Sequence, residues 1–205
     1  MDFSGFLVQL LNGLAGASSL FLVAAGLSLI FGVTRIVNFA HGSFYMVGIY
    51  VAYSLVMHLE DSLGFWPSIV MAALLVGVFG ALIEIFLLRR IYHAPELFQL
   101  LATFAVALMV RDAVLWFWGP EELLGPRAPG LEGAIEILGR QFPEYDLFLI
   151  AVGPIVLGLL WLLLTRTKWG TLVRAATQDR SMVSALGANQ AWLFTAVFAL
   201  GAALA

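Results

Sequence analysis

Residues 8–33 read VQLLNGLAGASSLFLVAAGLSLIFGV and contain no charged side chain. A helix needs about 20 mainly apolar residues to cross the hydrocarbon core of a bilayer, and this stretch exceeds that length. Met1, Asp2 and Phe3 precede it without a basic residue, so the layout differs from that of a cleaved signal peptide. We therefore predict a retained transmembrane helix here.

The composition of the whole chain agrees with a bilayer environment. Hydrophobic residues make up 62% of the 205 positions, charged residues only 11%, and the mean hydropathy is +0.99. That leaves too little polar surface for a water-soluble protein of this size. The net charge of −3 without a basic run excludes a nucleic-acid partner. The absence of cysteine excludes disulfides, thiolate metal sites and cysteine nucleophiles, and we predict no metal site.

Further apolar segments predict an all-α, polytopic transmembrane helix bundle of about six spans. The later spans are expected at residues 36–57, 68–83, 97–118, 147–164 and 191–205. The second reaches across only if Asn38 and His41 enter the membrane, so we expect an irregular start to this helix. The sixth is too short to cross. We therefore expect residues 1–205 to form a single transmembrane domain that lacks its C-terminal part.

The loop charges predict the orientation, because Lys and Arg collect on the cytoplasmic side. Residues 119–146 form an acidic loop, which we expect to be external, with only Arg127 and Arg140 as basic residues. Residues 165–190 form a basic, cytoplasmic segment. Its basic residues are Arg166, Lys168, Arg174 and Arg180. The N-terminus is then external, and the chain is expected in a bacterial inner membrane.

The external loop carries two further signals. Residues 131–138, followed by Gly139 and Arg140, fit either a short hairpin or a plain connector. Aromatic residues flank the loop where such side chains settle at headgroup level, and we expect them to be anchors. They are Trp116, Trp118 and Tyr145.

Small residues one turn apart predict where helices pack, because lipid offers little hydrophobic drive for helix association. The first span offers Ala24, Ser28 and Gly32. The third offers Ala73, Gly77 and Ala81. Glu84 continues the face of the third span. It is either a coupling acid in a transport path or, as its closeness to Arg89 favours, a structural partner near the cytoplasmic end.

The second span carries a stripe of polar and small residues on one helical face. Its members are three or four residues apart: Asn38, His41, Tyr45, Gly48 and Ala52. Polar groups at membrane depth cost a few kcal/mol each unless they find partners, so the stripe should face the bundle interior. Our hypothesis is that it borders a solute pathway, with His41 and Gly42 at a bent start. His41 alone fits a packing hydrogen bond to an adjacent helix as well.

Residues 165–190 predict two short helices. Gly170 is expected to break the preceding span and Thr171 to cap the first helix, while Asp179 caps the second and Gly187 ends it. The predicted apolar patch of the second helix consists of Met182, Val183 and Leu186. Such a helix either docks into a groove of another protein or lies on the membrane surface.

Two ordered motifs carry a family resemblance. The first comprises residues 26–33, GLSLIFGV, and residues 37–50, VNFAHGSFYMVGIY. The second comprises Thr165, Arg166, Gly170, Arg174, Ala175, Asp179, Leu186, Gly187 and Asn189, with residues 198–202, FALGA, after it. Together they closely resemble the branched-chain amino-acid ABC importer permeases of the LivH type, over most of the chain.

The resemblance implies a set of partners: a second homologous permease, two cytoplasmic ATPase subunits and a periplasmic binding protein that delivers an amino acid. The ATPases are expected to dock on the segment that contains Arg174, Ala175, Asp179, Leu186 and Gly187. No Walker-type loop occurs in this sequence, so we expect ATP and Mg²⁺ to be bound by the partners, with no cofactor and no enzymatic activity in this chain.

Departures from the family pattern leave the substrate open. Ser43 stands where a glutamate is common, Ile49 where an alanine is, and Ala188 where a branched residue is. Relatives with similar motifs serve urea, short amides or other amino acids. An ion-coupled secondary transporter is the main alternative. A membrane enzyme is disfavoured, because neither His58 nor His93 gives His41 a second ligand at its depth and no Gly-x-Ser-x-Gly elbow is present.

Overall fold

The computed structural model describes residues 3–121, 123, 125–137, 139–185 and 187–205, without the side chains of residues 60–63, 180 and 181. Within this part, five helices are long and apolar enough to cross a membrane. They are α1 (Phe3–Thr34), α2 (His41–Leu63), α3 (Phe65–Ile83), α5 (Glu96–Trp118) and α6 (Glu144–Arg166). The predicted all-α, polytopic class is confirmed.

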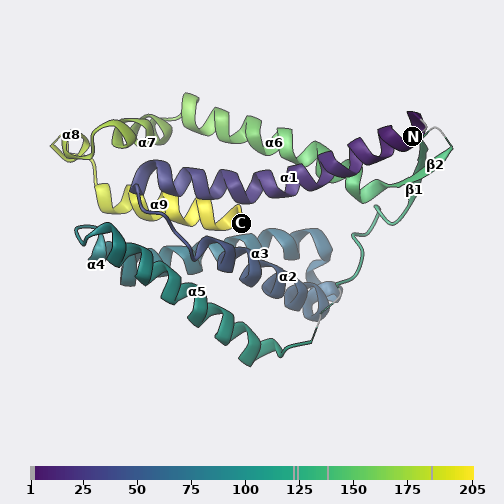
Figure 1. Ribbon diagram of the computed structural model, residues 1–205, viewed down its shortest axis with the longest axis horizontal. Helices are drawn as coiled ribbons and strands as arrows, with labels where there is room; N and C mark the ends of the chain where they lie inside the picture. Colours follow the sequence, from purple (N-terminus) through teal and green to yellow (C-terminus); the bar gives the residue numbers. More distant parts are fainter. Residues whose placement is uncertain (1–2, 122, 124, 138, 186) are drawn as a thin grey trace.

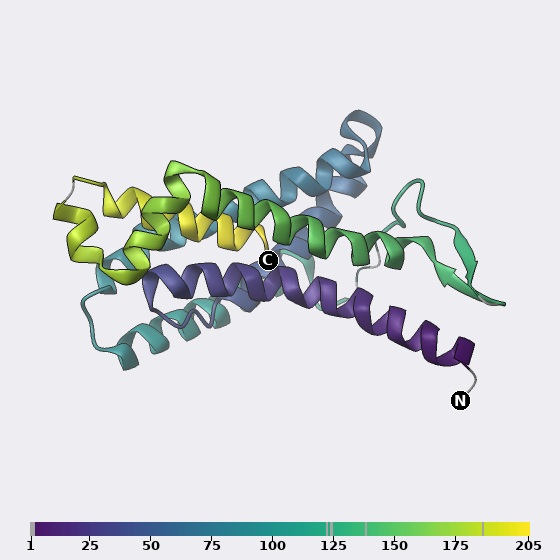
Figure 2. The same ribbon diagram turned by 90° about the horizontal axis from the view of Figure 1, so that it is seen from above.

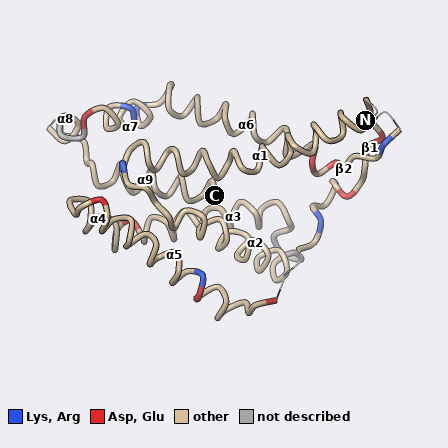
Figure 3. Tube along the Cα trace, viewed as in Figure 1, with Lys and Arg blue, Asp and Glu red and all other residues tan. Residues whose placement is uncertain are grey.

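The long helices run back and forth between two ends of the bundle (Figures 1 and 2). One end carries the N-terminus and a hairpin, β1 (Ala134–Ile137) and β2 (Arg140–Pro143). The other end carries α4 (Arg89–Ile91), α7 (Lys168–Gln178) and α8 (Arg180–Ala185). Figure 3 shows the charged residues mostly near these two ends, with long uncharged stretches between them. Loops that were predicted to lie on the same side of the membrane therefore lie at the same end of the bundle.

The start of α2 is irregular, as its polar sequence predicted. Residues 35–38 are non-helical and a turn at residues 39 and 40 leads into the helix at His41. Arg35 adopts a φ of 53°, an uncommon value for a residue with a side chain. The side-chain oxygen of Asn38 accepts a hydrogen bond from the backbone N–H of Ala40 at 3.1 Å. Asn38 therefore lies in the turn and not on the helix.

Of the two forms that the sequence left open for residues 131–140, a hairpin or a plain connector, the structure has the hairpin. Ile135 pairs with Phe142, and Ile137 with Arg140, in antiparallel register. Gly139 has a φ of 77°, a left-handed conformation that glycine adopts without steric penalty. Phe142, on β2, is fully buried.

A short helix, α9 (Gln190–Ala203), packs between α1 and α3. A Cβ atom on Gly26 of α1 would overlap the carbonyl oxygen of Gly201, and a Cβ atom on Gly80 of α3 would overlap Ala202. The three backbones approach this closely because these positions carry no side chain or a single methyl group. Phe198, from the same helix, packs edge to face against Phe44 of α2.

The predicted packing face of α3 is partly correct, since Gly77 is buried but Ala73 and Ala81 are only half-buried. The predicted face of α1 is wrong. Gly77 is buried against Ala199 of α9. In contrast, the α1 residues Ala24, Ser28 and Gly32 are all exposed. The buried face of α1 consists of Gly26, Ile30 and Val33. Both faces of α1 repeat at helical spacing, so the positions of small residues alone did not fix which one is buried.

Candidate functional site

The stripe on α2 divides into two parts with different surroundings. At its start, Asn38 and His41 are buried, with 4% and 2% of their surfaces exposed. The Nε2 atom of His41 lies 2.9 Å from the carbonyl oxygen of Val23 on α1, and Gly26 leaves room for the imidazole ring. A carbonyl can only accept, so Nε2 carries the hydrogen. This geometry favours the packing interpretation of His41.

Two polar atoms in this part have no hydrogen-bond partner within the described residues. They are Nδ1 of His41 and Nδ2 of Asn38. Buried polar atoms are paired in most proteins, so these two are exceptions. Gly42 is exposed, and a Cβ atom built on it would have no neighbour within 4 Å.

Further along α2, Tyr45, Gly48 and Ala52 line a cavity of about 370 Å³. Residues from α1, α3, α6 and α9 complete its wall, and Val23, Ile69, Val76 and Tyr145 are among them. Every lining side chain among the described residues is uncharged, and only Ser19 and the two tyrosines carry hydroxyl groups. Mostly apolar pockets with a few polar groups are typical of small-molecule sites. The structure thus brings Tyr45 and Gly48 to one cavity but leaves Asn38, His41 and Gly42 outside its lining.

The segment after α6 forms two short helices, although the first begins earlier than expected. Thr167, not Thr171, caps α7, since its side-chain oxygen accepts from the N–H of Gly170 at 2.9 Å. Gly170 lies inside α7 and does not break a helix. A Cβ atom there would overlap the carbonyl oxygens of Leu163 and Leu164, so glycine allows α7 to fold back against the end of α6.

The second short helix has the predicted ends. The side chain of Asp179 accepts a hydrogen bond from the N–H of Met182 at 3.1 Å, as an N-cap residue does. Gly187 has a φ of 81°. Its N–H donates to the carbonyl oxygen of Ser184, and the N–H of Ala188 donates to the carbonyl oxygen of Val183. This pattern is the glycine-terminated ending that the sequence indicated.

The predicted apolar patch of α8 is wrong in one member. Val183 is only 3% exposed and joins a cluster with Val33, Val173 and Phe194. Met182, in contrast, is 58% exposed. Leu186 lies outside the described residues. Val183 therefore anchors α8 to the bundle while Met182 faces outward.

The remaining residues predicted for coupling lie on or near the outer surface of this segment. Arg174, Asp179 and Gly187 are exposed and Ala175 is half-buried. Arg35, at the end of α1, donates a hydrogen bond to the carbonyl oxygen of Thr177 at 3.0 Å. We use the name coupling surface for the exposed residues Leu172, Arg174, Gln178, Asp179 and Met182. It is held to α1 and α9 by the cluster around Val183.

Glu84 has more partners than its sequence neighbours revealed. It is fully buried at the start of a π-helical turn, η1 (Glu84–Leu88), and forms a salt bridge with Arg89 at 3.0 Å. Tyr92 donates to its carboxylate at 2.8 Å, and Thr195 of α9 donates at 2.6 Å. The pairing with Arg89 was predicted. The contact with Thr195 was not, because nothing in the sequence indicates which face of α9 meets α3.

Comparison with known proteins agrees with this architecture. Residues 9–205 match the family described as branched-chain amino acid transport system, permease component. The permease protein BraD of Pseudomonas aeruginosa, from a high-affinity branched-chain amino acid transport system, is 29% identical over 98% of this chain and 68% of its own length. The corresponding LivH protein of Escherichia coli is 25% identical over the full chain and 69% of its own length.

A more distant relative comes from an archaeon. A probable branched-chain amino acid transport permease protein of Methanocaldococcus jannaschii is 27% identical over 82% of this chain and 54% of its own length. No solved structure matches the chain. The family match covers nearly all of the sequence and all the long helices, so the chain is a multi-pass membrane protein that belongs to the family of branched-chain amino acid transport permease components.

Proposed function

We propose that this chain is the membrane-spanning subunit of an ATP-binding-cassette importer that carries branched-chain or related amino acids across a bacterial inner membrane. The observation that carries the proposal is the uncharged cavity beside Tyr45 and Gly48. An aliphatic side chain gains roughly 1.5–3 kcal/mol on full burial in such surroundings. The relatives named above are branched-chain amino acid permeases, which supports the same substrate class.

The coupling surface supports the proposal that partner subunits drive transport with ATP. An amphipathic helix that presents an exposed face can lie in a groove of a partner protein. Here the partner is a pair of ATPase subunits that bind ATP and Mg²⁺, since this sequence has no Walker-type loop. A second permease and a periplasmic binding protein complete the proposed importer. This chain is a transport subunit and not an enzyme.

A physical route connects the coupling surface to the cavity. Val173 and Val183 pack with Val33 of α1 and with Leu193 and Phe194 of α9. The cavity is lined by other residues of the same two helices. A displacement of α7 and α8 by the ATPases would therefore move two walls of the cavity. Nucleotide binding to the partners would bias the bundle between outward-open and inward-open states.

The orientation follows from charge. The end that holds α7 and α8 carries Arg35, Arg166 and Arg174, while the hairpin end carries Glu132, Glu136 and Asp146 among other acids. Basic residues favour the cytoplasmic side, so α7 and α8 face the cytosol and the N-terminus is external.

Reconstitution tests the proposal. The chain is purified with the subunits that accompany it, inserted in liposomes and supplied with the binding protein. We expect uptake of radiolabelled leucine that requires ATP and resists dissipation of ion gradients. Uptake that persists without the ATPases, and stops when ion gradients collapse, would instead identify a secondary transporter. Competition by excess valine but not by urea separates the amino acid from the amide alternative.

A further inference from the structure

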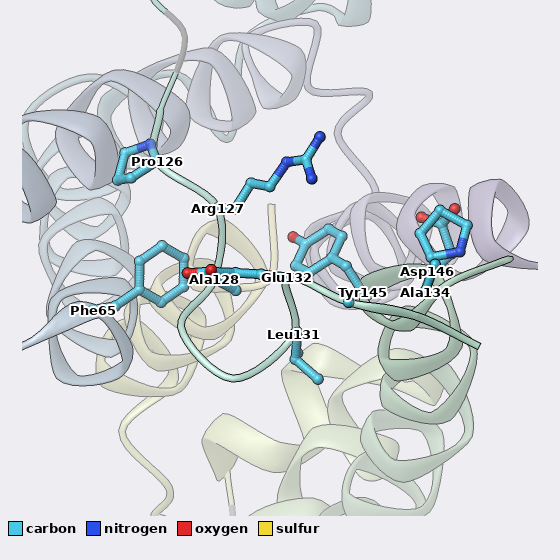
Figure 4. A pocket seen from close by; sticks show the side chains of 11 residues that line it. Phe65, Pro126, Arg127, Ala128, Leu131, Glu132, Ala134, Tyr145 and Asp146 are labelled. Carbon is cyan, nitrogen blue, oxygen red and sulfur yellow. The ribbon is translucent and has the colours of Figure 1, made fainter. Parts of the chain in front are cut away.

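A second pocket, which we call the outer pocket, lies at the hairpin end of the bundle (Figure 4). It has a volume of about 470 Å³, within the roughly 300–1,000 Å³ typical of small-molecule sites. The start of α3, the loop before β1 and the first turn of α6 form its walls. Unlike the cavity beside Tyr45, this pocket is lined by charges of both signs.

The side chains of the outer pocket fall into three chemical groups. Arg127 supplies a guanidinium group, Glu132 and Asp146 supply carboxylates, and Phe65 and Leu131 supply apolar surface. Arg127 makes no ion pair with another residue in the part of the chain that the structure describes. Asp146 lies in the first turn of α6, where the helix dipole stabilises a negative charge.

These three groups match the three parts of an aliphatic amino acid. A guanidinium group binds a carboxylate through two parallel hydrogen bonds, which gives it geometric selectivity. Carboxylates accept hydrogen bonds from an ammonium group, and the apolar surface accommodates an aliphatic side chain. The uncharged cavity offers no charged partner for either end of a zwitterion.

Tyr145 lines both the outer pocket and the cavity. In the view of Figure 4 its ring lies between Glu132 and Asp146, with the guanidinium group of Arg127 above it. Its sequence context predicted only a headgroup anchor. The structure instead places this side chain where the two spaces meet.

We propose that the outer pocket is a recognition site for the α-carboxylate and α-ammonium groups of an amino acid, which then passes Tyr145 into the cavity. This inference rests on the proposed transport function and adds a site to it. The outer pocket selects for the zwitterion, and the cavity selects for the side chain. Tyr145 is the side chain that separates the two steps.

The absence of native cysteine permits a direct test. Ala134 lines the outer pocket, whereas its neighbour Ile135 does not, because successive side chains of a strand point to opposite faces. The variants Ala134→Cys and Ile135→Cys are each reconstituted in the importer, with the partner subunits free of reactive cysteine. A membrane-impermeant thiol reagent is added outside, in the absence of the binding protein.

Leucine at about ten times its Kd should slow modification of Ala134→Cys about tenfold, because occupancy leaves roughly one pocket in ten open. Modification of Ile135→Cys should not change. Leucinamide lacks the carboxylate and 4-methylpentanoate lacks the ammonium group, so neither should protect Ala134→Cys at the same concentration. Adding Arg127→Gln should abolish protection by leucine, and Arg127→Lys should restore part of it.

The outcomes separate this inference from the proposed function. If leucine fails to slow modification of Ala134→Cys in an importer that still accumulates leucine with ATP, the recognition site alone is overturned. Equal protection by all three compounds would also overturn it. In a further arm the binding protein is added. Protection of Ala134→Cys by the binding protein, but not by leucine, would identify a protein docking surface instead. Protection by leucine without ATP-driven uptake would keep the site and contradict the proposed function.

Discussion

Two regions of the bundle use small residues in opposite ways. Where α9 packs against α1 and α3, Gly26, Gly80 and Gly201 allow backbones to touch, and no space remains for a Cβ atom. Beside Tyr45, in contrast, Gly48 and Ala52 leave a cavity of about 370 Å³. A small residue in a membrane helix therefore signals either close packing or open space. Only the position of the neighbouring helix decides which.

The largest effect is expected where α1 meets α9, from Gly26→Val. The added side chain would overlap the backbone of α9, and overpacking of this kind costs about 3 kcal/mol. We expect a large fall in the unfolding temperature of the purified protein, measured by tryptophan fluorescence in detergent. Gly32→Val is the matched control on the same helix, since no atom lies within 4 Å of a Cβ built there. Equal unfolding temperatures would refute the close packing of α1 on α9.

The next effect is expected from Glu84→Gln. The substitution removes the charge that accepts from Arg89, Tyr92 and Thr195 and leaves the buried site with surplus donors. Arg89 is partly exposed, so we expect a loss of about 2 kcal/mol in the free energy of unfolding, below the value for a fully buried pair. Denaturant titration measures it. Glu96→Gln, on an exposed carboxylate, serves as control. A loss of similar size there would show that the buried contacts of Glu84 add no stability.

A smaller effect on stability but a clear one on coupling is expected at the end of α8. Gly187→Ala places a side chain at a φ of 81°, which costs about 1 kcal/mol, and Asp179→Ala removes a helix cap of similar value. Both variants should insert normally and hydrolyse ATP with their partners while leucine uptake falls severalfold.

Gly139→Ala imposes the same kind of backbone strain at the opposite end, where φ is 77°. It should leave the ratio of uptake to ATP hydrolysis unchanged. Unaltered uptake in both α8 variants would refute a docking role for this segment.

The smallest effect on stability is expected beside the cavity. A Cβ atom on Gly48 would lie 3.7 Å from Val76, an ordinary contact, so Gly48→Ala should change the free energy of unfolding by less than about 0.5 kcal/mol. Gly48→Leu would extend into the cavity and should reduce leucine uptake strongly while the protein stays folded. Uptake at the normal rate in Gly48→Leu would show that substrate does not cross this cavity.

The sequence was sufficient for features that depend on local chemistry. Hydropathy located the spans, the polar residues before His41 predicted an irregular start to α2, and Asp179 and Gly187 marked the ends of α8. Thr167 was missed as a cap because Thr171 offered the same chemistry one turn later. Both side chains fit a helix start, and the return of α7 onto α6 decided between them.

Features that depend on helix rotation were less predictable. The stripe on α2 was expected to face one interior. Instead, His41 packs against α1 and Asn38 lies in the turn before the helix, while Tyr45 and Gly48 face the cavity. Val183 was assigned to an outer patch although it is buried. Each error concerns which neighbour a helical face meets, and that depends on contacts between segments far apart in the chain.

The proposed importer requires α7 and α8 to lie in the cytosol, where an ATPase can move them. Met182→Cys, at an exposed position on α8, and Ile135→Cys, at an exposed position on the hairpin, test it in intact cells with a membrane-impermeant thiol reagent. We predict immediate labelling of Ile135→Cys, and labelling of Met182→Cys only after the inner membrane is permeabilised. Labelling of Met182→Cys from outside, with Ile135→Cys protected, would place α7 and α8 outside the cell and exclude coupling to a cytoplasmic ATPase.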